Sequence, residues 1–329
     1  MKRILVYEHL SGAGVSAAAR DDDGMLAMGQ AMRDAVVEDL IRLEDYEVSV
    51  ATRDPALPVP AAATPVTPRP GESARDFVAR QGDAHHLVWV VAPETDGILS
   101  DLQRSVDPAR WIGCDGPAIK LASSKRATLM RLAAAGLPTP LAFEHAPETT
   151  RWVVKPDDGA GALATQLHPD PEVALADWSL RSRTGGPMAI EPWVDGEALS
   201  LSLLCCNGRS ELLSVNRQHV VVDADGVLSF RGVEVNVLPV ATPRAAWSRG
   251  SEPRVATLRA LATRIGRTVT GLCGFVGIDL VWHAQRGPVV IEINPRVTCA
   301  YVGLSRALGR NLAAEVIAAL GPGAARGHA

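Results

Sequence analysis

The strongest constraint on the fold is a predicted β-hairpin over residues 277–296. Two apolar runs, 278–282 and 289–293, are typical of β-strands, and Gln-Arg-Gly at 285–287 forms the turn between them. Asp279 interrupts the first of these apolar runs. The segment therefore predicts paired strands with polar groups set among apolar ones.

Three oxygen-bearing side chains come together on this hairpin. Glu292 and Asn294 lie two residues apart and point to one face of the second strand, and Asp279 lies on the first strand. Such ligands suit Mg²⁺, with Mn²⁺ as the alternative, because Mg²⁺ binds a few carboxylates together with phosphate oxygens. Arg296 follows at once and presents a planar fork of donors for phosphate or carboxylate. A solvent-exposed polar face of an ordinary hairpin is the other explanation.

Length and composition indicate a globular protein of several parts. The chain of 329 residues exceeds what one hydrophobic core usually serves, so we expect two or three subdomains. A net charge of −4 gives no sign of a nucleic-acid or membrane surface. The five cysteines have no metal-binding spacing, the first apolar run is too short for a signal peptide, and no run would span a bilayer. We therefore expect a cytoplasmic protein with reduced thiols.

The first part of the chain alternates strands with helices. The predicted elements are strands at 4–7, 48–51 and 87–92, helices at 25–43 and 73–80, and a proline-rich extended loop at 53–71. This alternation predicts a small Rossmann-like α/β domain. In such sheets the ligand crevice lies at the carboxyl ends of the strands, which places Glu8, Ser11 and Glu94 near a substrate.

One motif in this part points to a different ligand. Gly12, Gly14 and Ala17, after the first strand, match a glycine-rich dinucleotide fingerprint. The fingerprint also needs an acid at the end of the second strand, about 20 residues on, whereas that strand ends near Thr52, almost twice as far. A nicotinamide-dependent oxidoreductase is therefore the weaker alternative.

The middle of the chain carries two lysines and a glycine-rich loop suited to phosphate. Lys125 opens a predicted helix, and a strand at 152–154 leads into Lys155. The loop that follows, 157–162, contains Asp158, Gly159, Ala160 and Gly161. Backbone N–H groups of such a loop can hold anionic oxygens while a lysine adds a point charge. An ordinary β-turn beside a surface lysine is the alternative.

A predicted hinge then follows the strand that begins at Met188. Its backbone groups could bind the edge of adenine, and Glu197 beyond it could accept both ribose hydroxyls, although a solvated acid at a strand end is the alternative. The later elements are a strand at 212–218 that carries Asn216, Arg217 and Gln218, an amphipathic helix at 253–269 expected behind the hairpin, and a final helix at 310–320.

In this order and spacing, the motifs resemble those of the ATP-grasp carboxylate–amine ligases over roughly residues 100–320. They are Ser-Lys125 before a helix ending Ala-Gly-Leu-Pro-Thr-Pro, Val-Val-Lys155-Pro with Asp-Gly-Ala-Gly, Glu191-Pro-Trp-Val-x-Gly-Glu197, Asp279, and Glu292-Ile-Asn294-Pro-Arg296. The resemblance implies an α/β chain with the α+β ATP-grasp fold. Its parts would be a Rossmann-like pre-ATP-grasp domain (1–115), a central subdomain with the glycine-rich loop (116–195) and a C-terminal subdomain with the metal site (196–329).

The resemblance also implies a role for each motif. The nucleotide contacts would be Lys125, Lys155 and the loop 157–162 for the ATP phosphates, Glu191 with the backbone of Trp193 and Val194 for adenine, and Glu197 for ribose. The Mg²⁺ ligands would be Asp279, Glu292 and Asn294. Arg296 would steady the transferred phosphoryl group.

One position departs from the resemblance. D-alanine ligases carry an arginine two residues before the metal-binding aspartate, where it supports the tetrahedral intermediate, but this chain has Gly277 there. Either Arg217 or Arg296 would have to replace it. The attacking amine must also lose a proton, for which Glu8, His9 and His219 are candidate acceptors.

A narrower resemblance links the chain to the tyramine–glutamate ligases of methanofuran-type cofactor synthesis. The motifs are Ile-Leu-Val-Tyr-Glu-His-Leu-Ser-Gly-Ala-Gly at the start, Ala-Pro-Glu94-Thr-Asp, Leu-Ser-Val-Asn216-Arg-Gln218, and Asn-Pro-Arg-Val-Thr-Cys-Ala-Tyr301-Val-Gly-Leu. It implies that the side-chain carboxylate of glutamate is joined to tyramine or tyrosine. The candidate substrate contacts are Glu8, Ser11, Glu94, Asn216 and Gln218. A homodimer is common among relatives; the alternatives are ligation of another amino acid or peptide, and a relative that binds nucleotide without catalysis.

Overall fold

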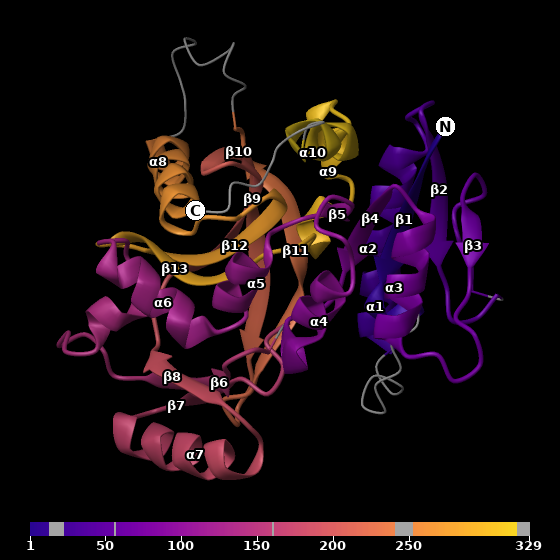
Figure 1. The fold of residues 1–329 in the computed structure, drawn as a ribbon. Helices are drawn as coiled ribbons and strands as arrows, with labels where there is room; N and C mark the ends of the chain where they lie inside the picture. Colours follow the sequence, from indigo (N-terminus) through magenta and orange to yellow (C-terminus); the bar gives the residue numbers. More distant parts are fainter. Residues whose placement is uncertain (13–22, 56, 160, 241–252, 321–329) are drawn as a thin grey trace.

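The computed structural model describes residues 1–12, 23–55, 57–159, 161–240 and 253–320. Three β-sheets follow one another along this part of the chain, with helices packed on them (Figure 1). Some predicted features lie outside the described residues, namely Gly14 and Ala17 of the fingerprint and Ala160 of the glycine-rich loop.

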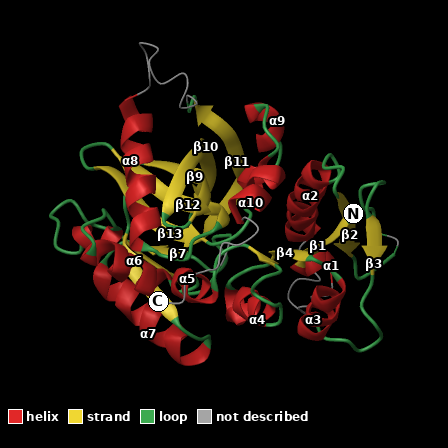
Figure 2. Cartoon of the chain, turned by 45° about the horizontal axis from the view of Figure 1, so that its top comes forward, coloured by secondary structure: helices red, strands yellow, loops and turns green. Residues whose placement is uncertain are grey.

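The first sheet is parallel, with the strand order β3-β2-β1-β4-β5. Its strands are β1 (Lys2–Glu8), β2 (Tyr46–Ala51), β3 (Thr64–Val66), β4 (Leu87–Val91) and β5 (Trp111–Ile112). Ile4 and Val6 pack in one apolar cluster with helix α2 (Asp23–Leu40), and Leu5 and Tyr7 pack in another with α3 (Ala74–Ala84). The helices therefore cover both faces of this sheet, as Figure 2 shows, which confirms the predicted α/β fold.

The proline-rich stretch at 53–71 was predicted to be an extended loop, but part of it forms a strand. It contains β3, with Pro65 at its centre, paired with β2 at the edge of the sheet. Proline lacks an N–H but is tolerated in an edge strand, where one side of the backbone has no ladder to complete. The proline content therefore favoured a loop in the prediction, whereas pairing with β2 stabilises a strand.

Two antiparallel sheets make up the rest. The small sheet has the order β7-β6-β8, formed by β6 (Trp152–Pro156), β7 (Gln166–His168) and β8 (Met188–Pro192), and α7 (Pro171–Thr184) packs on it. The large sheet has the order β11-β10-β9-β12-β13, formed by β9 (Glu197–Cys206), β10 (Arg209–Val222), β11 (Leu228–Leu238), β12 (Gly274–His283) and β13 (Gly287–Asn294). The pairing of β12 with β13 confirms the predicted hairpin.

One face of the large sheet is apolar. Leu199 and Leu201 of β9 and Leu280 of β12 lie in one buried cluster with Leu258 of α8 (Pro253–Thr268). The prediction that α8 lies behind the hairpin needs correction, because α8 packs mainly against β10 and α6 (Lys125–Ala134) contacts β13. Since side chains alternate along a strand, the polar residues of the same strands gather on the opposite face.

Buried hydrogen bonds join the first sheet's layer to the end of the chain. Asp39 of α2 accepts hydrogen bonds from Tyr301, at 2.7 Å, and from Ser305. Tyr301 ends a short 3₁₀ segment (Cys299–Tyr301), and Ser305 lies in α9 (Leu304–Leu308). The other helices are α1 (His9–Gly12), α4 (Ile98–Arg104), α5 (Gly116–Ala122) and α10 (Leu312–Leu320), which begins two residues later than predicted. These contacts hold the segment after the hairpin against α2.

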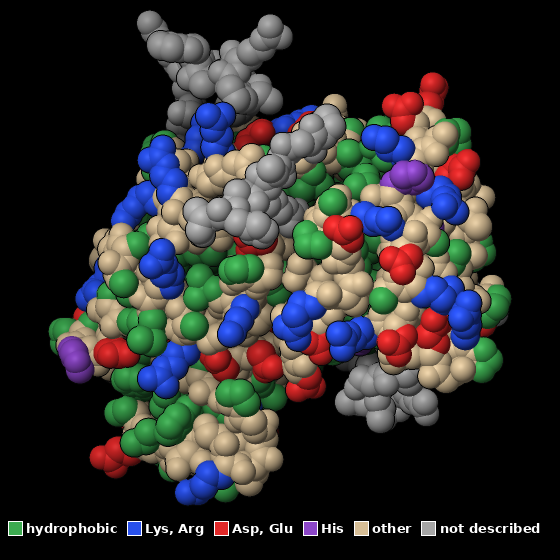
Figure 3. Space-filling view, viewed as in Figure 1, with side chains coloured by type: hydrophobic (Ala, Val, Ile, Leu, Met, Phe, Trp, Pro, Cys, Tyr) green, Lys and Arg blue, Asp and Glu red, His purple; other side chains and the backbone are tan. Residues whose placement is uncertain are grey.

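The surface carries both signs of charge. On the face shown in Figure 3, basic and acidic side chains are interspersed. Within the described ranges, no helix has the length and apolar character needed to cross a membrane.

Candidate active site

Two carboxyl groups face each other across the hairpin. Asp279 of β12 pairs directly with Glu292 of β13, and a register shift follows immediately after Asp279. The side-chain amide of Gln218 donates to Oδ1 of Asp279 at 2.9 Å, and that of Asn294 donates to Oδ2 at 3.1 Å. Burial and the negative charge of Glu292 raise the pKa of Asp279 well above its usual value. The predicted metal ligands therefore do lie together, with Gln218 as an additional support.

The polar row continues across the sheet. Asp279 is paired with Ser200 of β9, and Ser200 with Asn216 of β10. Asn216 is fully buried and donates to Ser200 and, at 3.1 Å, to Ser202. Asn216, predicted as a substrate contact, thus makes these hydrogen bonds within the row of polar side chains; its role towards a substrate stays a prediction.

Two lysines lie beside Glu292. The ammonium of Lys125 is 3.4 Å from Oε2 of Glu292 and donates to the carbonyl of Gly159, and that of Lys155 lies 2.5 Å from Oε1 of Glu191. Although burial acts in the opposite direction, Lys125 and Lys155 lower the pKa of Glu292. The second oxygen of Glu191 is buried and has no partner among the described residues. Each of the two lysines thus forms an ion pair with an acid, Lys125 with Glu292 and Lys155 with Glu191.

The glycine-rich loop contacts two other parts of the chain. Asp157 accepts hydrogen bonds from Ser124 at 2.6 Å and from the backbone N–H of Arg126 at 2.8 Å, which fixes the start of α6. Asp158 accepts from the backbone N–H of Asp96 at 2.8 Å. Gly161 has φ of 68°, a left-handed conformation that suits glycine. The loop therefore lies between α6, which carries Lys125, and the turn that follows β4.

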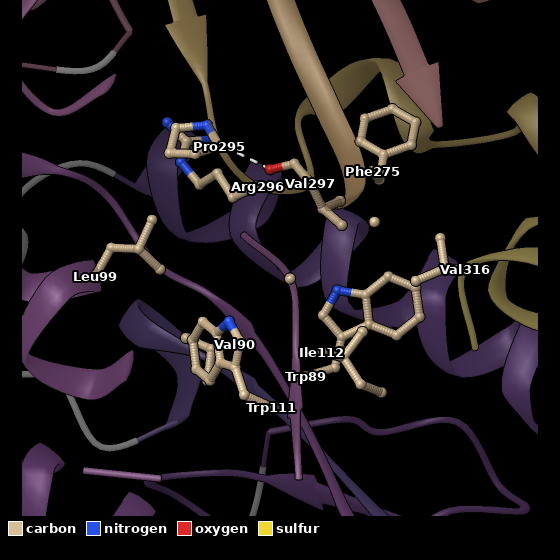
Figure 4. A pocket seen from close by; sticks show the side chains of 12 residues that line it. Trp89, Val90, Leu99, Trp111, Ile112, Phe275, Pro295, Arg296, Val297 and Val316 are labelled. Atoms are coloured by element: carbon tan, nitrogen blue, oxygen red, sulfur yellow. Dashed lines mark hydrogen bonds between the residues drawn. The ribbon is translucent and has the colours of Figure 1, made fainter. Parts of the chain in front are cut away.

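Arg296 is held by Glu94 at the carboxyl end of β4. Nη2 of Arg296 lies 2.9 Å from Oε2 of Glu94 and 3.5 Å from Oδ1 of Asn294. Figure 4 shows the hydrogen bond that Nη1 donates to the carbonyl of Val297 at 3.2 Å. Although burial acts the other way, Glu94 raises the pKa of Arg296. Arg296 lines a small pocket together with the apolar side chains of Trp89, Val90 and other residues. The structure thus brings the predicted phosphoryl-binding arginine beside a predicted substrate residue.

Comparison with known proteins identifies the family. A model of the ATP-grasp domain matches residues 122–300, more than half of the 329-residue chain, and a model of the pre-ATP-grasp domain matches residues 47–119.

The chain belongs to the ATP-grasp family. It is therefore an ATP-grasp ligase, the enzyme class that the motifs predicted.

Solved ATP-grasp structures share the fold. An ATP-grasp superfamily protein from Archaeoglobus fulgidus is 20% identical and covers 97% of this chain and 88% of its own, with a TM-score of 0.67. The L-amino acid ligase from Bacillus licheniformis is 18% identical, covering 98% of this chain and 75% of its own with a TM-score of 0.63. VanG D-Ala:D-Ser ligase from Enterococcus faecalis is 13% identical, covering 97% and 99% with a TM-score of 0.67. A search of curated proteins gave no match.

The structure gives a physical reason for glycine at position 277 of this ATP-grasp chain. A Cβ atom there would lie 2.6 Å from Cγ2 of Thr298 and 3.4 Å from Cβ of Asn294. Thr298, two residues beyond Arg296, therefore fills the space that an arginine at 277 would need. Thr298 was not singled out in the sequence, although it belongs to the Asn-Pro-Arg-Val-Thr motif.

Arg217 and Glu197 form a separate group of charges. Oε1 of Glu197 lies 3.1 Å from Arg217, and Oε2 lies 2.6 Å from Arg254. Burial opposes it, but the two arginines lower the pKa of Glu197. Arg217 also pairs with Glu234 at 3.1 Å, whereas its neighbour Gln218 reaches Asp279. Of the two candidate arginines, Arg296 is thus the one beside the hairpin acids.

The hinge offers fewer free groups than predicted. The backbone N–H of Trp193 donates to the carbonyl of Arg151 at 2.9 Å, and Val194 is buried in an apolar cluster with Phe143. The free oxygen of Glu191 therefore remains the clearest acceptor for a nucleotide at this point.

The three candidate proton acceptors are poorly placed. Both oxygens of Glu8 accept local hydrogen bonds, from the backbone N–H of Leu10 at 3.0 Å and from the N–H and hydroxyl of Ser11 at 2.8 and 2.7 Å. His9 is buried, and burial lowers its pKa to about 4. His219 is exposed on β10. Glu8 and Ser11 therefore satisfy one another rather than presenting free groups.

The hairpin residues could hold a divalent cation. Among the described residues, no cluster of three or more His, Cys, Asp or Glu side chains could bind a metal alone. Asp279 and Glu292 nevertheless supply two adjacent carboxylates, and Asn294 a third oxygen. Such a partial ligand set suits Mg²⁺, which takes its other ligands from phosphate and water.

Proposed function

We propose that the chain is an ATP-dependent carboxylate–amine ligase that forms an amide through an acyl phosphate. The observation that carries the proposal is the arrangement around Glu292 and Asp279: Lys125 lies 3.4 Å from Glu292, and the charges of Lys155 and Arg296 also act on Glu292. Cations that flank two carboxylates in this way suit the transfer of a phosphoryl group, where negative charge is spread over several oxygens.

The side chains have separable parts in this reaction. Lys125 and Lys155 would neutralise phosphate oxygens, and Arg296 would bind the phosphoryl group as it reaches the substrate carboxylate. Bound Mg²⁺, held by Asp279, Glu292 and Asn294, would supply charge neutralisation for the phosphates. The loop at Asp158 would exclude water, which otherwise hydrolyses an acyl phosphate.

We further propose L-glutamate and tyramine, or tyrosine, as the first substrates to test. Support comes from the motif resemblance around Glu94, Asn216 and Tyr301, and from the fold shared with ligases that act on amino acids. Ligation of another amino acid or peptide is the second candidate. A relative without catalysis is less well supported, because the paired Asp279 and Glu292 and both lysines are in place.

The test measures release of phosphate from ATP with Mg²⁺ against a panel of carboxylates and amines, led by glutamate with tyramine and with tyrosine. Glu292→Gln and Lys155→Ala should abolish ligation without loss of the fold. Asp101→Asn is a matched control, because Asp101 forms an exposed ion pair with Arg104 on α4. Near-normal ligation by either active-site variant would overturn the proposal, and so would the absence of turnover with every pair.

A further inference from the structure

We propose that Glu94 is the group that accepts a proton from the attacking amine. The inference rests on the proposed ligase function and goes beyond it, because none of the base candidates found in the sequence is well placed. Glu94 lies at the carboxyl end of β4, where a parallel sheet presents its ligand crevice, and its ion-pair partner is Arg296.

Only one of the two carboxylate oxygens of Glu94 has a partner among the described residues. The residue is 5% exposed, and Oε2 receives Arg296, but Oε1 is buried with no partner among the described residues. Nε of Arg296 is likewise buried and unpartnered. A buried polar atom without a partner costs about 1–3 kcal/mol, so such an atom is expected to meet water, an ion or a ligand. One free acceptor and one free donor therefore lie on the two members of a single ion pair.

The two free groups suit the two reactants that must meet. The free N–H of Arg296 suits an acyl phosphate oxygen, since Arg296 lies beside the acids of the hairpin. The free oxygen of Glu94 suits the N–H of an amine that approaches the same acyl group. A fixed pair of this kind would place nucleophile and electrophile side by side.

Other acids near the site already have both oxygens engaged or face elsewhere. Glu8 accepts three local hydrogen bonds, and Glu197 is held by two arginines. Glu191 keeps a free oxygen but belongs to the pair with Lys155 in the small sheet. Among the described acids, Glu94 thus combines a free oxygen with contact to Arg296.

The glycine-rich loop lies against the turn that carries Glu94. Asp158 accepts from the N–H of Asp96 at 2.8 Å, and the hydroxyl of Thr95 donates to the carbonyl of Asp158 at 3.4 Å. Asp96 adopts φ of 54°, a left-handed conformation that is uncommon for a residue with a side chain. The loop that would protect the acyl phosphate from water therefore contacts the two residues that follow the proposed proton acceptor.

The proton balance of the step is as follows. R–NH₃⁺ first gives one proton to Oε1 of Glu94, which frees a lone pair on nitrogen. That lone pair forms a bond to the acyl carbon, and the bond from that carbon to the phosphate oxygen breaks, with its electron pair leaving on phosphate. Nitrogen loses two protons in total. One passes to Oε1 of Glu94 and on to solvent, and the other leaves with the phosphate as HPO₄²⁻. No oxidant, reductant or further reactant is needed.

The experiment compares two nucleophiles in wild type and Glu94→Gln. Tyramine is charged at neutral pH and needs a proton acceptor, whereas hydroxylamine is uncharged and traps the acyl phosphate as a hydroxamate without one. The glutamine keeps an oxygen for Arg296 but cannot take a proton. We expect the ratio of amide to hydroxamate formation to fall about 100-fold, the range typical of general base catalysis. Both assays use the acid that gives the fastest phosphate release in the panel above.

Two further variants make the result decisive. Asp96→Asn changes an exposed acid on the same turn and should leave the ratio unchanged. Glu94→Asp retains a shorter carboxylate and should give an intermediate ratio with an altered pH profile, and it replaces Glu94→Gln if the latter does not fold. An equal fall in both products would mean that Glu94 only positions Arg296, and no fall in either would mean that it has no role; both outcomes overturn the inference. Failure of wild type to form either product would instead refute the proposed ligase.

Discussion

Acidification should destabilise the fold through His9, because this buried side chain must become charged to bind a proton. His9 is 7% exposed, and its Nδ1 lies 3.2 Å from the hydroxyl of Tyr7. Burial lowers its pKa from 6.5 to about 4. The unfolded chain therefore binds a proton more readily than the native protein below pH 6.5, so stability falls as the pH falls from 6.5 towards 4.

The size of the effect follows from the two pKa values. The interval from 6.5 to about 4 corresponds to roughly 3 kcal/mol of unfolding free energy, because one pH unit is worth about 1.4 kcal/mol. About 2 kcal/mol of this should already be lost at pH 5. A loss of about 2 kcal/mol is substantial, because the unfolding free energy of a typical domain is about 5–15 kcal/mol.

The assay is urea unfolding of wild type and His9→Gln at a series of pH values between 7.5 and 4.5. Other groups titrate in both proteins, so the difference between the two curves isolates His9. Wild type should lose about 2 kcal/mol more than the variant between pH 7 and 5. His145→Gln is the control, because His145 is exposed. Parallel curves for wild type and His9→Gln would refute the reasoning, and His9 could then again be considered as a base.

Two further predictions concern the hairpin and its arginines. Gly277→Ala should lower the unfolding free energy by about 1–3 kcal/mol, because the new Cβ lies 2.6 Å from Thr298, and Thr298→Ala in the same chain should recover most of it; urea midpoints that show no such coupling would contradict the geometry. Arg296→Met should reduce phosphate release at least about 100-fold, whereas Arg217→Met should act mainly on the KM for ATP through Glu197; steady-state kinetics that show the reverse pattern would assign the roles differently.

Much of the fold could be predicted from local patterns. The apolar runs at β1 and β4 and the alternating hairpin strands identify elements whose burial is set by their own residues. Strand β3 could not be predicted, because its three residues include Pro65 and become a strand only by pairing with β2. The position of α8 on β10 also depends on packing between distant segments. The boundaries at 115/116 and 195/196 stay predictions.

The candidate site was predicted as a set of residues but not as a set of contacts. Glu292, Asp279 and Asn294 are close in sequence, so strand pairing alone brings them together. Glu94 and Arg296 are separated by 202 residues, and no local pattern shows that they form an ion pair. For the same reason the sequence could not show that Arg217 forms an ion pair with Glu197.

The acids of the site outnumber its cations, and the unmatched acid lies on the hairpin. The acids are Glu94, Glu191, Asp279 and Glu292, and the cations are Lys125, Lys155 and Arg296. Each cation already lies against one acid, so Asp279 is left with two neutral amide donors and a raised pKa. When Asp279 is ionised, a phosphate oxygen about 4 Å from its carboxylate would be repelled by several kcal/mol at an effective dielectric constant of about 20. Because each cation already forms an ion pair with an acid, an ionised Asp279 would leave free ATP facing an excess of negative charge. We therefore expect the arrangement to suit ATP that arrives with its Mg²⁺, and the proposed metal ligand Asp279 to be the main source of this preference.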